Sequence, residues 1–311
     1  METDYDIIII GCGPAGMTAG VYAKRAGMKC LILEKLTPGG QVAIIPTIEN
    51  YTGFKKIDGI GLSQKMFEQV SEIGVDVVFS ECYSISFNDG LKEVKTKNQT
   101  FKAPAIILAM GAASRALGTA EDKKFVGKGL SYCAVCDGAF FKDKCVAVVG
   151  GENTALEDIA YISNIAKTVI HINRRSEFRA DDQNIKIYNK LLEQKDSKIK
   201  QYLGYVVEKL YGDKKLESID IRNLADNTVK NIKLDGVFVA IGKVPQTDIL
   251  DKEVKLDENG YIVVNDKMET SIDGVFACGD ITHKILRQIS TVVSDGSIAG
   301  TYASLYVKKH R

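Results

Sequence analysis

Short apolar runs, separated by polar turns and by stretches with helical periodicity, recur along the chain. Mostly apolar runs of this kind lie at Tyr5–Ile10, Pro104–Leu108, Lys144–Val149 and Asp235–Ala240. A nearly continuous apolar run of strand length is typical of a parallel strand that is buried on both faces. Because such strands alternate here with helical stretches, the pattern predicts an α/β fold built on parallel sheets.

One succession of elements occurs twice: a buried strand, a glycine-rich turn, a helix and a second strand. The first copy has its helix at Met17–Ala26 and its second strand at Lys29–Leu33, and the second copy has them at Leu156–Ile165 and Thr168–Ile172. Each copy is a βαβ unit, so we predict two Rossmann-like dinucleotide-binding domains. The pattern also predicts helices at 66–73, 184–192 and 290–305, strands at 75–79, 84–87, 93–96 and 274–280, and a small antiparallel meander at 199–207, 215–221 and 228–233.

The turn of the first copy reads Gly11-Cys12-Gly13-Pro14-Ala15-Gly16, a G-x-G-x-x-G sequence between a strand and a helix. Glu34 follows at the end of the next strand, about 20 residues on, as dinucleotide-binding sites require. Gly13 lets the backbone approach a pyrophosphate at the helix N-terminus, and Glu34 can accept hydrogen bonds from ribose hydroxyls. The alternative interpretation is an ordinary glycine turn.

The second copy has the turn Gly150-Gly151-Glu152-Asn153-Thr154-Ala155, and basic residues take the place of the acid after its second strand. These are Arg174, Arg175 and Arg179. A guanidinium pairs well with phosphate oxygens, so this site is suited to a ribose that carries a 2′-phosphate. The alternative is that these arginines only solvate the edge of the domain.

Near the middle of the chain, Cys133 and Cys136 are separated by two residues and Asp137 follows at once. Two cysteines at this spacing can form a redox-active disulfide, and the carboxyl group can donate a proton to a leaving thiolate and take it back. Half of a zinc site and a chance pair of buried thiols are the alternatives. Zinc would need a second such pair or a pair of histidines, whereas the other five cysteines are isolated and the chain has three histidines.

Length and charge narrow the class of protein. A chain of 311 residues is longer than one core usually supports, which agrees with two domains. With 41 basic and 40 acidic residues and no basic run, neither nucleic acid nor an anionic membrane is indicated as a partner. The apolar runs are too short to span a bilayer, and the acidic start of the chain leads us to expect no signal peptide and a cytoplasmic protein.

Taken together, these motifs resemble a low-molecular-weight thioredoxin reductase from end to end. The resemblance implies a discontinuous FAD-binding domain at residues 1–116 and 247–311, with an NADPH-binding domain that carries the redox cysteines inserted at 117–246. It further implies a homodimer that passes electrons from NADPH through FAD and the Cys133/Cys136 disulfide to thioredoxin. On the same ground, Cys136 is expected to lie nearest the flavin.

The resemblance also implies which residues bind the cofactors. For FAD they are Gly11, Gly13, Pro14, Ala15, Gly16, Glu34, Lys35, Gly39, Gly40, Gln41, Asn50, Gly111, Gly279, Asp280, Arg287, Gln288 and Ile289. For NADPH they are Gly150, Gly151, Asn153, Thr154, Arg174, Arg175 and Arg179.

Two positions depart from the family pattern in the second site. Glu152 stands where the fingerprint has its second glycine, and Asn173 stands where the family has the histidine of His-Arg-Arg. A carboxylate beside a pyrophosphate adds a like charge, so NADH, reduced ferredoxin or another donor is an alternative to NADPH. A flavin reductase of the ferredoxin–NADP type, or a diaphorase, is the alternative of another class, but neither needs the two thiols. A non-enzymatic flavin-binding redox sensor is a third alternative.

Overall fold

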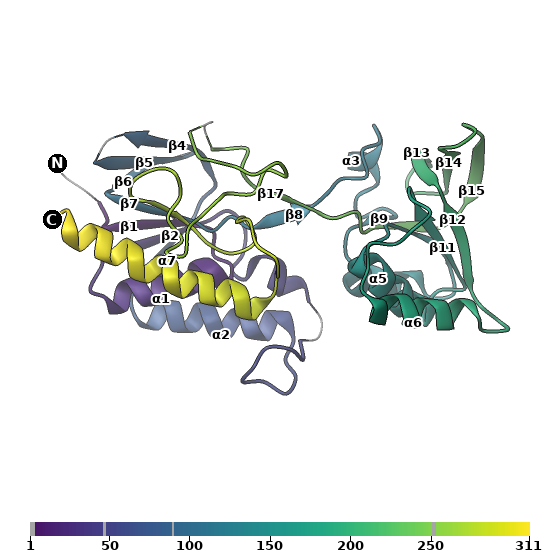
Figure 1. Ribbon diagram of the computed structural model, residues 1–311, viewed down its shortest axis with the longest axis horizontal. Coiled ribbons are helices and arrows are strands. Elements are labelled where there is room, and N and C mark those ends of the chain that lie inside the picture. The colour runs from purple at the N-terminus through teal and green to yellow at the C-terminus, as the bar shows by residue number, and fades with distance from the viewer. Residues whose placement is uncertain (1–3, 46–47, 89, 251–252) are drawn as a thin grey trace. The chain divides into compact units, whose positions relative to one another are not determined.

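The computed structural model describes residues 4–45, 48–88, 90–250 and 253–311, with the backbone alone at Asn88 and Cys136. It divides into two compact units, one formed by Met1–Ala113 with Val244–Arg311 and the other by Ser114–Lys243 (Figure 1). The boundaries expected from the sequence, after residues 116 and 246, lie three residues further along the chain at both crossings. The crossings fall within β8 (Ala112–Ser114) and β17 (Lys243–Pro245), which pair with each other as a two-stranded sheet.

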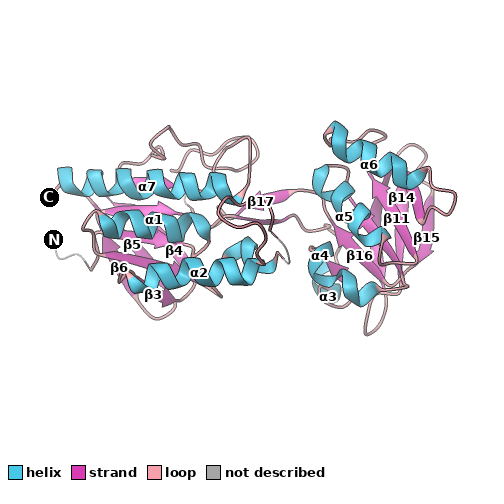
Figure 2. Cartoon of the chain, turned by 90° about the horizontal axis from the view of Figure 1, so that it is seen from below, coloured by secondary structure: helices cyan, strands magenta, loops and turns pink. Residues whose placement is uncertain are grey.

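The first unit is built on a five-stranded sheet whose strands pair in parallel. Its order is β18 (Val275–Ala277), β7 (Ala105–Leu108), β1 (Ile7–Ile10), β2 (Cys30–Glu34) and β3 (Asp76–Phe79). The helices α1 (Pro14–Arg25), α2 (Gly59–Glu72) and α7 (Ile289–Lys309) cover one face (Figures 1 and 2). An antiparallel sheet of β4 (Cys82–Asn88), β5 (Leu91–Thr96) and β6 (Thr100–Ala103) lies toward the other face.

The four isoleucines of β1 explain why this strand lies in the middle of the unit. Successive side chains of a strand point to opposite faces of the sheet. Ile7 and Ile9 accordingly pack into the core shared with α1 and α7, whereas Ile8 and Ile10 pack into the core shared with the antiparallel sheet. A strand with two buried faces needs apolar residues at every position, and this one has them.

The second unit repeats this arrangement. Its five strands also pair in parallel, in the order β12 (Ile199–Leu203), β11 (Thr168–Asn173), β10 (Cys145–Val149), β16 (Gly236–Val239) and β9 (Leu130–Ser131). The helices α5 (Asn153–Ser163) and α6 (Asp182–Leu192) cover one face, and the antiparallel sheet β13 (Tyr205–Tyr211), β14 (Ser218–Asn223) and β15 (Val229–Lys233) lies toward the other (Figure 1). The short helices are α3 (Asp122–Phe125), α4 (Ala134–Asp137) and the 3-10 segments η1 (Gly40–Ile44) and η2 (Gly138–Phe141).

Two of the expected elements differ in extent from those in the structure. The run 199–207 is two strands, because Gly204 takes a φ of +79° between them and its N–H donates to the Asn173 carbonyl at 2.8 Å. The helix expected at 66–73 begins at Gly59, where the Asp58 side chain caps it by accepting from the Gly61 N–H at 2.8 Å.

Among the described residues, no helix is both long enough and apolar enough to cross a membrane.

Candidate active site

Cys133 lies directly between β9 and α4 and is disulfide-bonded. Because β9 pairs in parallel with β16, with Ser131 opposite Phe238, the cysteine follows the carboxyl end of a sheet strand. Ligands and reacting groups in open α/β sheets gather at that end. The side chain of Cys136, one of the predicted redox residues, lies outside the described part of the chain.

The carboxyl group of Asp137 is held by Ser131, a residue to which the sequence pattern gave no role. The Ser131 hydroxyl donates to Asp137 Oδ2 at 2.6 Å and accepts from the Cys133 N–H at 3.1 Å. The Asp137 N–H in turn donates to the Cys133 carbonyl at 3.2 Å. The signal that could have found this serine is its position two residues before the first cysteine, at the end of a strand.

The remaining cysteines are free thiols and are poor nucleophiles. They are Cys12, Cys30, Cys82, Cys145 and Cys278. Burial raises the pKa of each, to about 12 for Cys12 and Cys30 and to about 11 for Cys82, so little thiolate forms at neutral pH. Within the described residues, no group of three or more His, Cys, Asp or Glu side chains could hold a metal ion.

The first glycine turn has the geometry of a phosphate cradle. Gly11 has a φ of +107°, and a Cβ atom there would lie 2.4 Å from the Ala109 carbonyl oxygen. A Cβ on Gly16 would lie 2.0 Å from the Gly11 carbonyl oxygen, so both positions require glycine. By contrast, nothing lies within 4 Å of a Cβ on Gly13, the N-cap of α1. Space is therefore open beside this helix N-terminus, which carries no side-chain cap.

Glu34 stabilises this turn before any ligand is considered. One carboxylate oxygen accepts from the Cys12 N–H at 2.9 Å and the other accepts from the Leu36 N–H at 2.9 Å. Each oxygen keeps a second lone pair, so a ribose hydroxyl can still donate to the group. The neighbouring Lys35 is exposed and forms an ion pair of 3.8 Å with Glu81, which takes its ammonium group toward another partner.

Several other predicted FAD residues lie around the same turn. The Gly39 N–H donates to the Cys12 carbonyl at 2.8 Å, and a Cβ on Gly40 would lie 3.6 Å from the Gly13 Cα. A Cβ on Gly279 would lie 2.8 Å from the Cβ of Ala15. Segments from three parts of the sequence therefore meet at the fingerprint.

The remaining predicted FAD residues are placed as follows. Asn50 donates to the side chain of Gln288 at 3.1 Å, and Gln288 is the N-cap of α7, which begins at Ile289. Gln41 is exposed at the start of η1. Gly111 has a φ of +68° and its carbonyl accepts from the Gln246 N–H at 3.0 Å, so it lies in the paired crossing rather than in the glycine turn.

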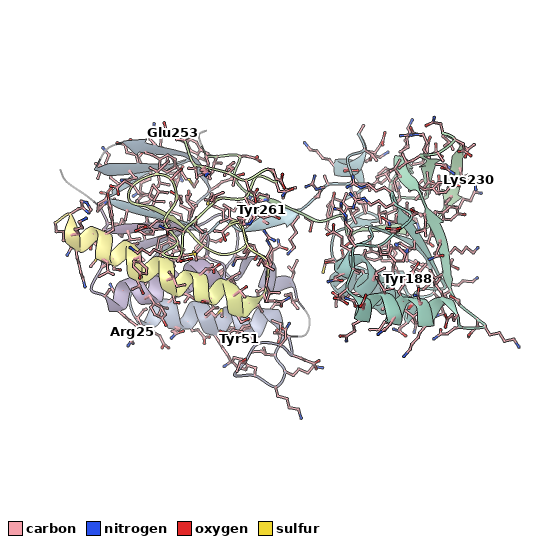
Figure 3. All side chains as sticks on the ribbon, viewed as in Figure 1. Arg25, Tyr51, Tyr188, Lys230, Glu253 and Tyr261 are labelled. Atoms are coloured by element: carbon pink, nitrogen blue, oxygen red, sulfur yellow. The ribbon has the colours of Figure 1, made fainter. Side chains whose placement is uncertain are left out.

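Two buried polar atoms near the end of β18 have no protein partner. They are Asp280 Oδ1 and Arg287 Nε. The other guanidinium nitrogens of Arg287 donate to the carbonyls of Lys284 and Thr282 at 3.3 Å, and the group lies 4.0 Å from the ring centre of Tyr261, labelled in Figure 3. Buried polar atoms are normally paired, so these two are available to a polar ligand. Together with the cradle at Gly11–Gly16, they fit a flavin dinucleotide.

Asp295 of α7 fixes the backbone at this place. Its Oδ2 accepts from the Gly279 N–H at 3.0 Å and also pairs with the ammonium group of Lys284. The pair is nearly buried, so a single carboxylate joins α7 to the turn that carries Asp280 and to the loop that carries Arg287.

The second glycine turn is closed in the same manner. Gly150 has a φ of +146°, and a Cβ there would lie 2.1 Å from the Ala240 carbonyl oxygen. A Cβ on Gly151 would lie 2.6 Å from the side-chain amide of Asn173. Asn153 and Thr154 lie exposed in the first turn of α5.

The loop that carries the arginines is hydrogen-bonded to this turn. The Arg179 N–H donates to the Gly151 carbonyl at 2.7 Å, and the Asp181 N–H donates to the Asn153 side chain at 2.7 Å. Asn173 holds the loop from within, because its buried amide donates to the carbonyls of Arg175 and Glu177 at 3.0 and 3.2 Å. The departure from the family's histidine therefore has a structural role that the sequence did not indicate.

Glu152 is the N-cap of α5, and its side chain is exposed. Its φ of −107° and ψ of 178° are ordinary extended values, so the side chain costs no backbone strain. Its effect on a bound nucleotide would be electrostatic, because it places a negative charge at the helix N-terminus.

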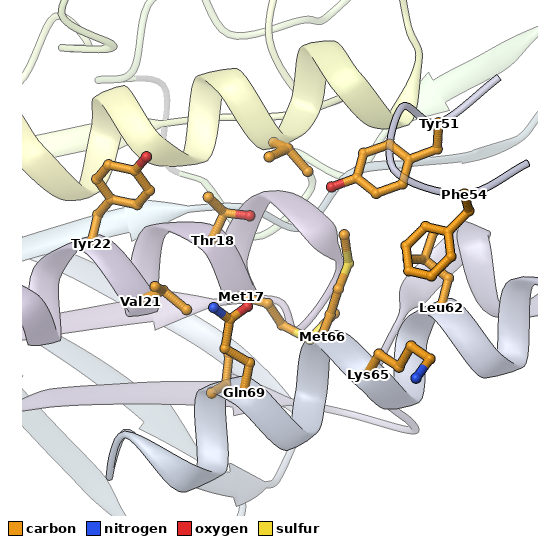
Figure 4. Close-up of a pocket in the computed structure, with 12 residues that line it drawn as sticks. Met17, Thr18, Val21, Tyr22, Tyr51, Phe54, Leu62, Lys65, Met66 and Gln69 are labelled. Carbon is orange, nitrogen blue, oxygen red and sulfur yellow. The ribbon is translucent and has the colours of Figure 1, made fainter.

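A surface cavity of about 320 Å³ lies elsewhere in the first unit (Figure 4). Side chains from α1, α2, α7 and the loop at Tyr51 and Phe54 line it. None of the predicted cofactor residues lines this cavity, so it is separate from the site described above.

Comparison with known proteins agrees with this geometry. Residues 5–296 match the pyridine nucleotide-disulphide oxidoreductase family. A thioredoxin reductase of Listeria innocua is 40% identical over 309 residues, which are 99% of this chain and 95% of the relative. A thioredoxin reductase of Ureaplasma parvum is 38% identical over 98% of both chains.

The fold comparison gives the same result over the whole chain. The crystal structure of Lactococcus lactis thioredoxin reductase in its FR conformation matches with a TM-score of 0.87 and 36% identity, and the match covers 98% of this chain and 100% of that one. A likeness of this extent in sequence and fold means that the chain belongs to the pyridine nucleotide-disulphide oxidoreductase family.

Proposed function

We propose that the chain is a thioredoxin-disulfide reductase that uses NADPH as donor, FAD as carrier and a Cys133–Cys136 disulfide as the reacting group. The observation that carries the proposal is the disulfide-bonded Cys133 at the start of α4, with the Asp137 carboxyl group tied to the same turn by Ser131. A redox disulfide inside a Rossmann-like unit fits the thioredoxin reductases that this chain resembles in sequence and fold.

The reaction divides into two steps with balanced electrons and protons. The fingerprint turn, with Asp280 and Arg287, would hold FAD, which would supply the two electrons that NADPH provides. With two protons, these electrons convert the Cys133–Cys136 disulfide to two thiols. A thiolate of this pair then attacks the disulfide of thioredoxin and forms a mixed disulfide, which the second thiol resolves. The chain's disulfide forms again, and thioredoxin leaves as a dithiol.

Asp137 is proposed to move the protons of these steps. Its N–H donates to the Cys133 carbonyl, so the carboxyl group lies within one helical turn of the first sulfur. The Ser131 hydroxyl fixes one carboxyl oxygen, which leaves the other oxygen to exchange a proton with a thiol.

Exposed apolar side chains beside the disulfide support a protein substrate. Val135 and Phe140 are 38% and 73% exposed, and both lie within the α4–η2 segment. Apolar groups at this position can contact the surface around the disulfide of a partner.

Opposite charges at the second glycine turn bear on the identity of the electron donor. The arginine loop supports a nucleotide with a 2′-phosphate, whereas Glu152 opposes binding of a pyrophosphate at the same turn. Glu152 is the specific observation that favours the second candidate, a thioredoxin reductase supplied by NADH, reduced ferredoxin or another donor. The homodimer and the cytoplasmic location expected from the sequence are also proposals.

A rapid-mixing experiment separates the candidates. Oxidised holoenzyme is mixed anaerobically with NADPH, NADH or reduced ferredoxin, and bleaching of the flavin absorbance is followed. The proposal predicts bleaching by NADPH ahead of NADH, and subsequent reduction of added thioredoxin. If reduced ferredoxin alone bleaches the flavin and millimolar NADPH does not, the second candidate replaces the first.

A further inference from the structure

Two buried side chains, His171 and Tyr188, and the exposed Gln201 form a hydrogen-bonded series beneath the second glycine turn. Gln201 of β12 donates to the Tyr188 hydroxyl at 2.8 Å, Tyr188 of α6 lies 2.6 Å from His171 Nδ1, and His171 Nε2 of β11 lies 2.8 Å from the Gly150 carbonyl oxygen. Tyr188 is labelled in Figure 3, between α6 and the parallel sheet. His171 and Tyr188 are both fully buried. None of these three residues was singled out by the sequence motifs.

The chemistry of the groups allows one arrangement of the protons. A carbonyl oxygen only accepts, so His171 Nε2 must carry a proton. Burial lowers the pKa of His171 to about 4, so the ring is neutral near pH 7 and Nδ1 carries none. Nδ1 therefore accepts from the Tyr188 hydroxyl, whose oxygen accepts from Gln201. Every polar atom along the series then has a partner.

The end of the series fixes the direction of a peptide group. The carbonyl of Gly150 and the N–H of Gly151 belong to the same planar trans peptide, in which they point in opposite directions. Because His171 holds the carbonyl toward the interior, the Gly151 N–H points the other way, toward the N-terminal side of α5. No backbone acceptor for this N–H occurs among the described residues.

The preceding peptide group and the His171 ring are also held in place. The Gly150 N–H donates to the Ile172 carbonyl at 3.0 Å, and Gly150 is buried. The His171 ring is stacked 5.4 Å from Phe178 and meets Tyr188 edge-on at 5.1 Å, so it cannot turn without displacing two aromatic rings. An apolar residue at 171 would fill the same core, but it would leave the Gly150 carbonyl buried without a donor.

We infer that His171, held by Tyr188 and Gln201, is a positioning residue for the pyridine nucleotide: it aims the Gly151 N–H at the pyrophosphate. The inference rests on the proposed function, because it assigns the neighbouring turn to a dinucleotide. It also suits a turn in which Glu152 opposes the phosphates, since a correctly aimed N–H offsets part of that repulsion.

Three variants test the role of His171. His171→Leu removes the donor, Tyr188→Phe removes only the hydroxyl that orients the ring, and His171→Gln places an amide N–H near the position of Nε2. The FAD-loaded enzyme is titrated with NADP⁺, and KM and kcat are measured with NADPH and thioredoxin. We expect the NADP⁺ Kd and the NADPH KM to rise about tenfold in His171→Leu and about threefold in Tyr188→Phe, and to stay within about twofold of wild type in His171→Gln. The KM for thioredoxin and the kcat should hardly change.

Tyr202→Phe is the matched control, because Tyr202 follows Gln201 in β12 and its hydroxyl takes no part in the series. Its NADP⁺ affinity should equal that of the wild type. A His171→Leu enzyme with wild-type affinity for NADP⁺ would overturn the inference and leave the proposed function intact. If the wild-type holoenzyme itself binds no NADP⁺, the proposed donor is wrong, and the nucleotide role of His171 is wrong with it.

A second measurement does not depend on folding of the leucine variant or on the donor. The chain has three histidines, so ¹⁵N-histidine labelling gives three imidazole signals, and His171→Gln identifies one of them. We expect His171 in the Nε2–H tautomer, without titration between pH 5.5 and 8, and a shifted Nδ1 resonance in Tyr188→Phe. A His171 that carries its proton on Nδ1, or that titrates near pH 6.5, would contradict the arrangement.

Discussion

Ser131 Oγ donates a hydrogen bond of 2.6 Å to Asp137 Oδ2, and the same oxygen accepts from the Cys133 N–H at 3.1 Å. One hydroxyl therefore fixes the acid and the first redox cysteine in relation to each other. Since Ser131 ends β9, which pairs with β16, this arrangement is anchored to the parallel sheet rather than to a loop.

The first prediction concerns this serine. Ser131→Ala removes a hydrogen bond to a charged acceptor, worth about 1.5 kcal/mol, so thioredoxin reduction should slow roughly tenfold. Reduction of the bound flavin by the donor should keep its rate, because Ser131 is not among the predicted nucleotide-binding residues. Steady-state and rapid-mixing assays measure the two steps separately.

Ser131→Thr keeps the hydroxyl and should retain most of the activity. Asp137→Asn should slow thioredoxin reduction by roughly 10²- to 10⁴-fold, less than loss of a cysteine, since water can replace part of a proton donor's role. If Ser131→Ala turns over at the wild-type rate, the hydroxyl does not position the acid.

The second prediction concerns the charge at the nucleotide turn. Glu152→Gly and Glu152→Gln both remove a carboxylate from the N-terminus of α5, and each should tighten NADPH binding by one to two powers of ten, or about 1.5–3 kcal/mol. Arg174→Ala combined with Arg175→Ala should abolish the preference for NADPH over NADH. Fluorescence titration of the oxidised holoenzyme with NADP⁺ and NAD⁺ measures both effects.

Glu193→Gln is the control, because it removes an exposed carboxylate of the same unit that lies at the C-cap of α6, away from the second glycine turn in the sequence. It should leave the nucleotide affinity unchanged. Equal affinity in Glu152→Gln and wild type would mean that the carboxylate does not face the phosphates.

The third prediction is an acid sensitivity that originates at His171. Burial lowers the pKa of this ring from 6.5 to about 4, so the unfolded chain binds the proton more readily between these values. This contribution to stability is complete above about pH 6.5 and declines as the pH falls toward 4, by at most about 3 kcal/mol. Urea denaturation of wild type and His171→Gln at pH 7.5 and pH 5 should show a smaller loss in the variant. An identical loss in both proteins would count against a buried neutral ring.

The fourth prediction has the opposite sign and concerns Asp158 of α5. Burial, followed by the charge of Glu157, raises the pKa of Asp158 from 3.8 to about 7, so the folded chain binds the proton more readily. Its carboxylate is therefore destabilising above pH 7, and the penalty disappears as the pH falls toward 4. Asp158→Asn should stabilise the protein at pH 8 by about 2 kcal/mol and have little effect at pH 4.5. A variant that is no more stable than wild type at pH 8 would show that the carboxylate is well solvated.

Those parts of the fold that depend on residue periodicity could be predicted from the sequence. The buried strands around Ile7–Ile10 and Cys145–Val149 and the glycine turns after them follow from apolar runs and from glycine's freedom to take positive φ. The division of 199–207 could not be predicted, because both strands have similar composition and only the tertiary pairing of β12 with β11 separates them.

The site was predictable where a motif carries it and not where single contacts complete it. Cys133, Asp137 and the fingerprint at Gly11–Gly16 are recognisable by spacing. Ser131 could be found only from its position two residues before Cys133, whereas Asp295 acts through a backbone N–H 16 residues away and His171 through a carbonyl 21 residues away. No local pattern encodes such partners, since they depend on how the strands are placed in the sheet.

The central claim is that the chain carries a redox-active disulfide in addition to its flavin. Anaerobic titration of the holoenzyme with dithionite tests it directly, because a flavin takes up two electrons and a disulfide takes up two more. We predict four electrons per FAD for wild type and two for Cys133→Ser and Cys136→Ser, which should keep FAD but fail to reduce thioredoxin. Uptake of two electrons by the wild type, or thioredoxin reduction at near the wild-type rate by either variant, would contradict the account.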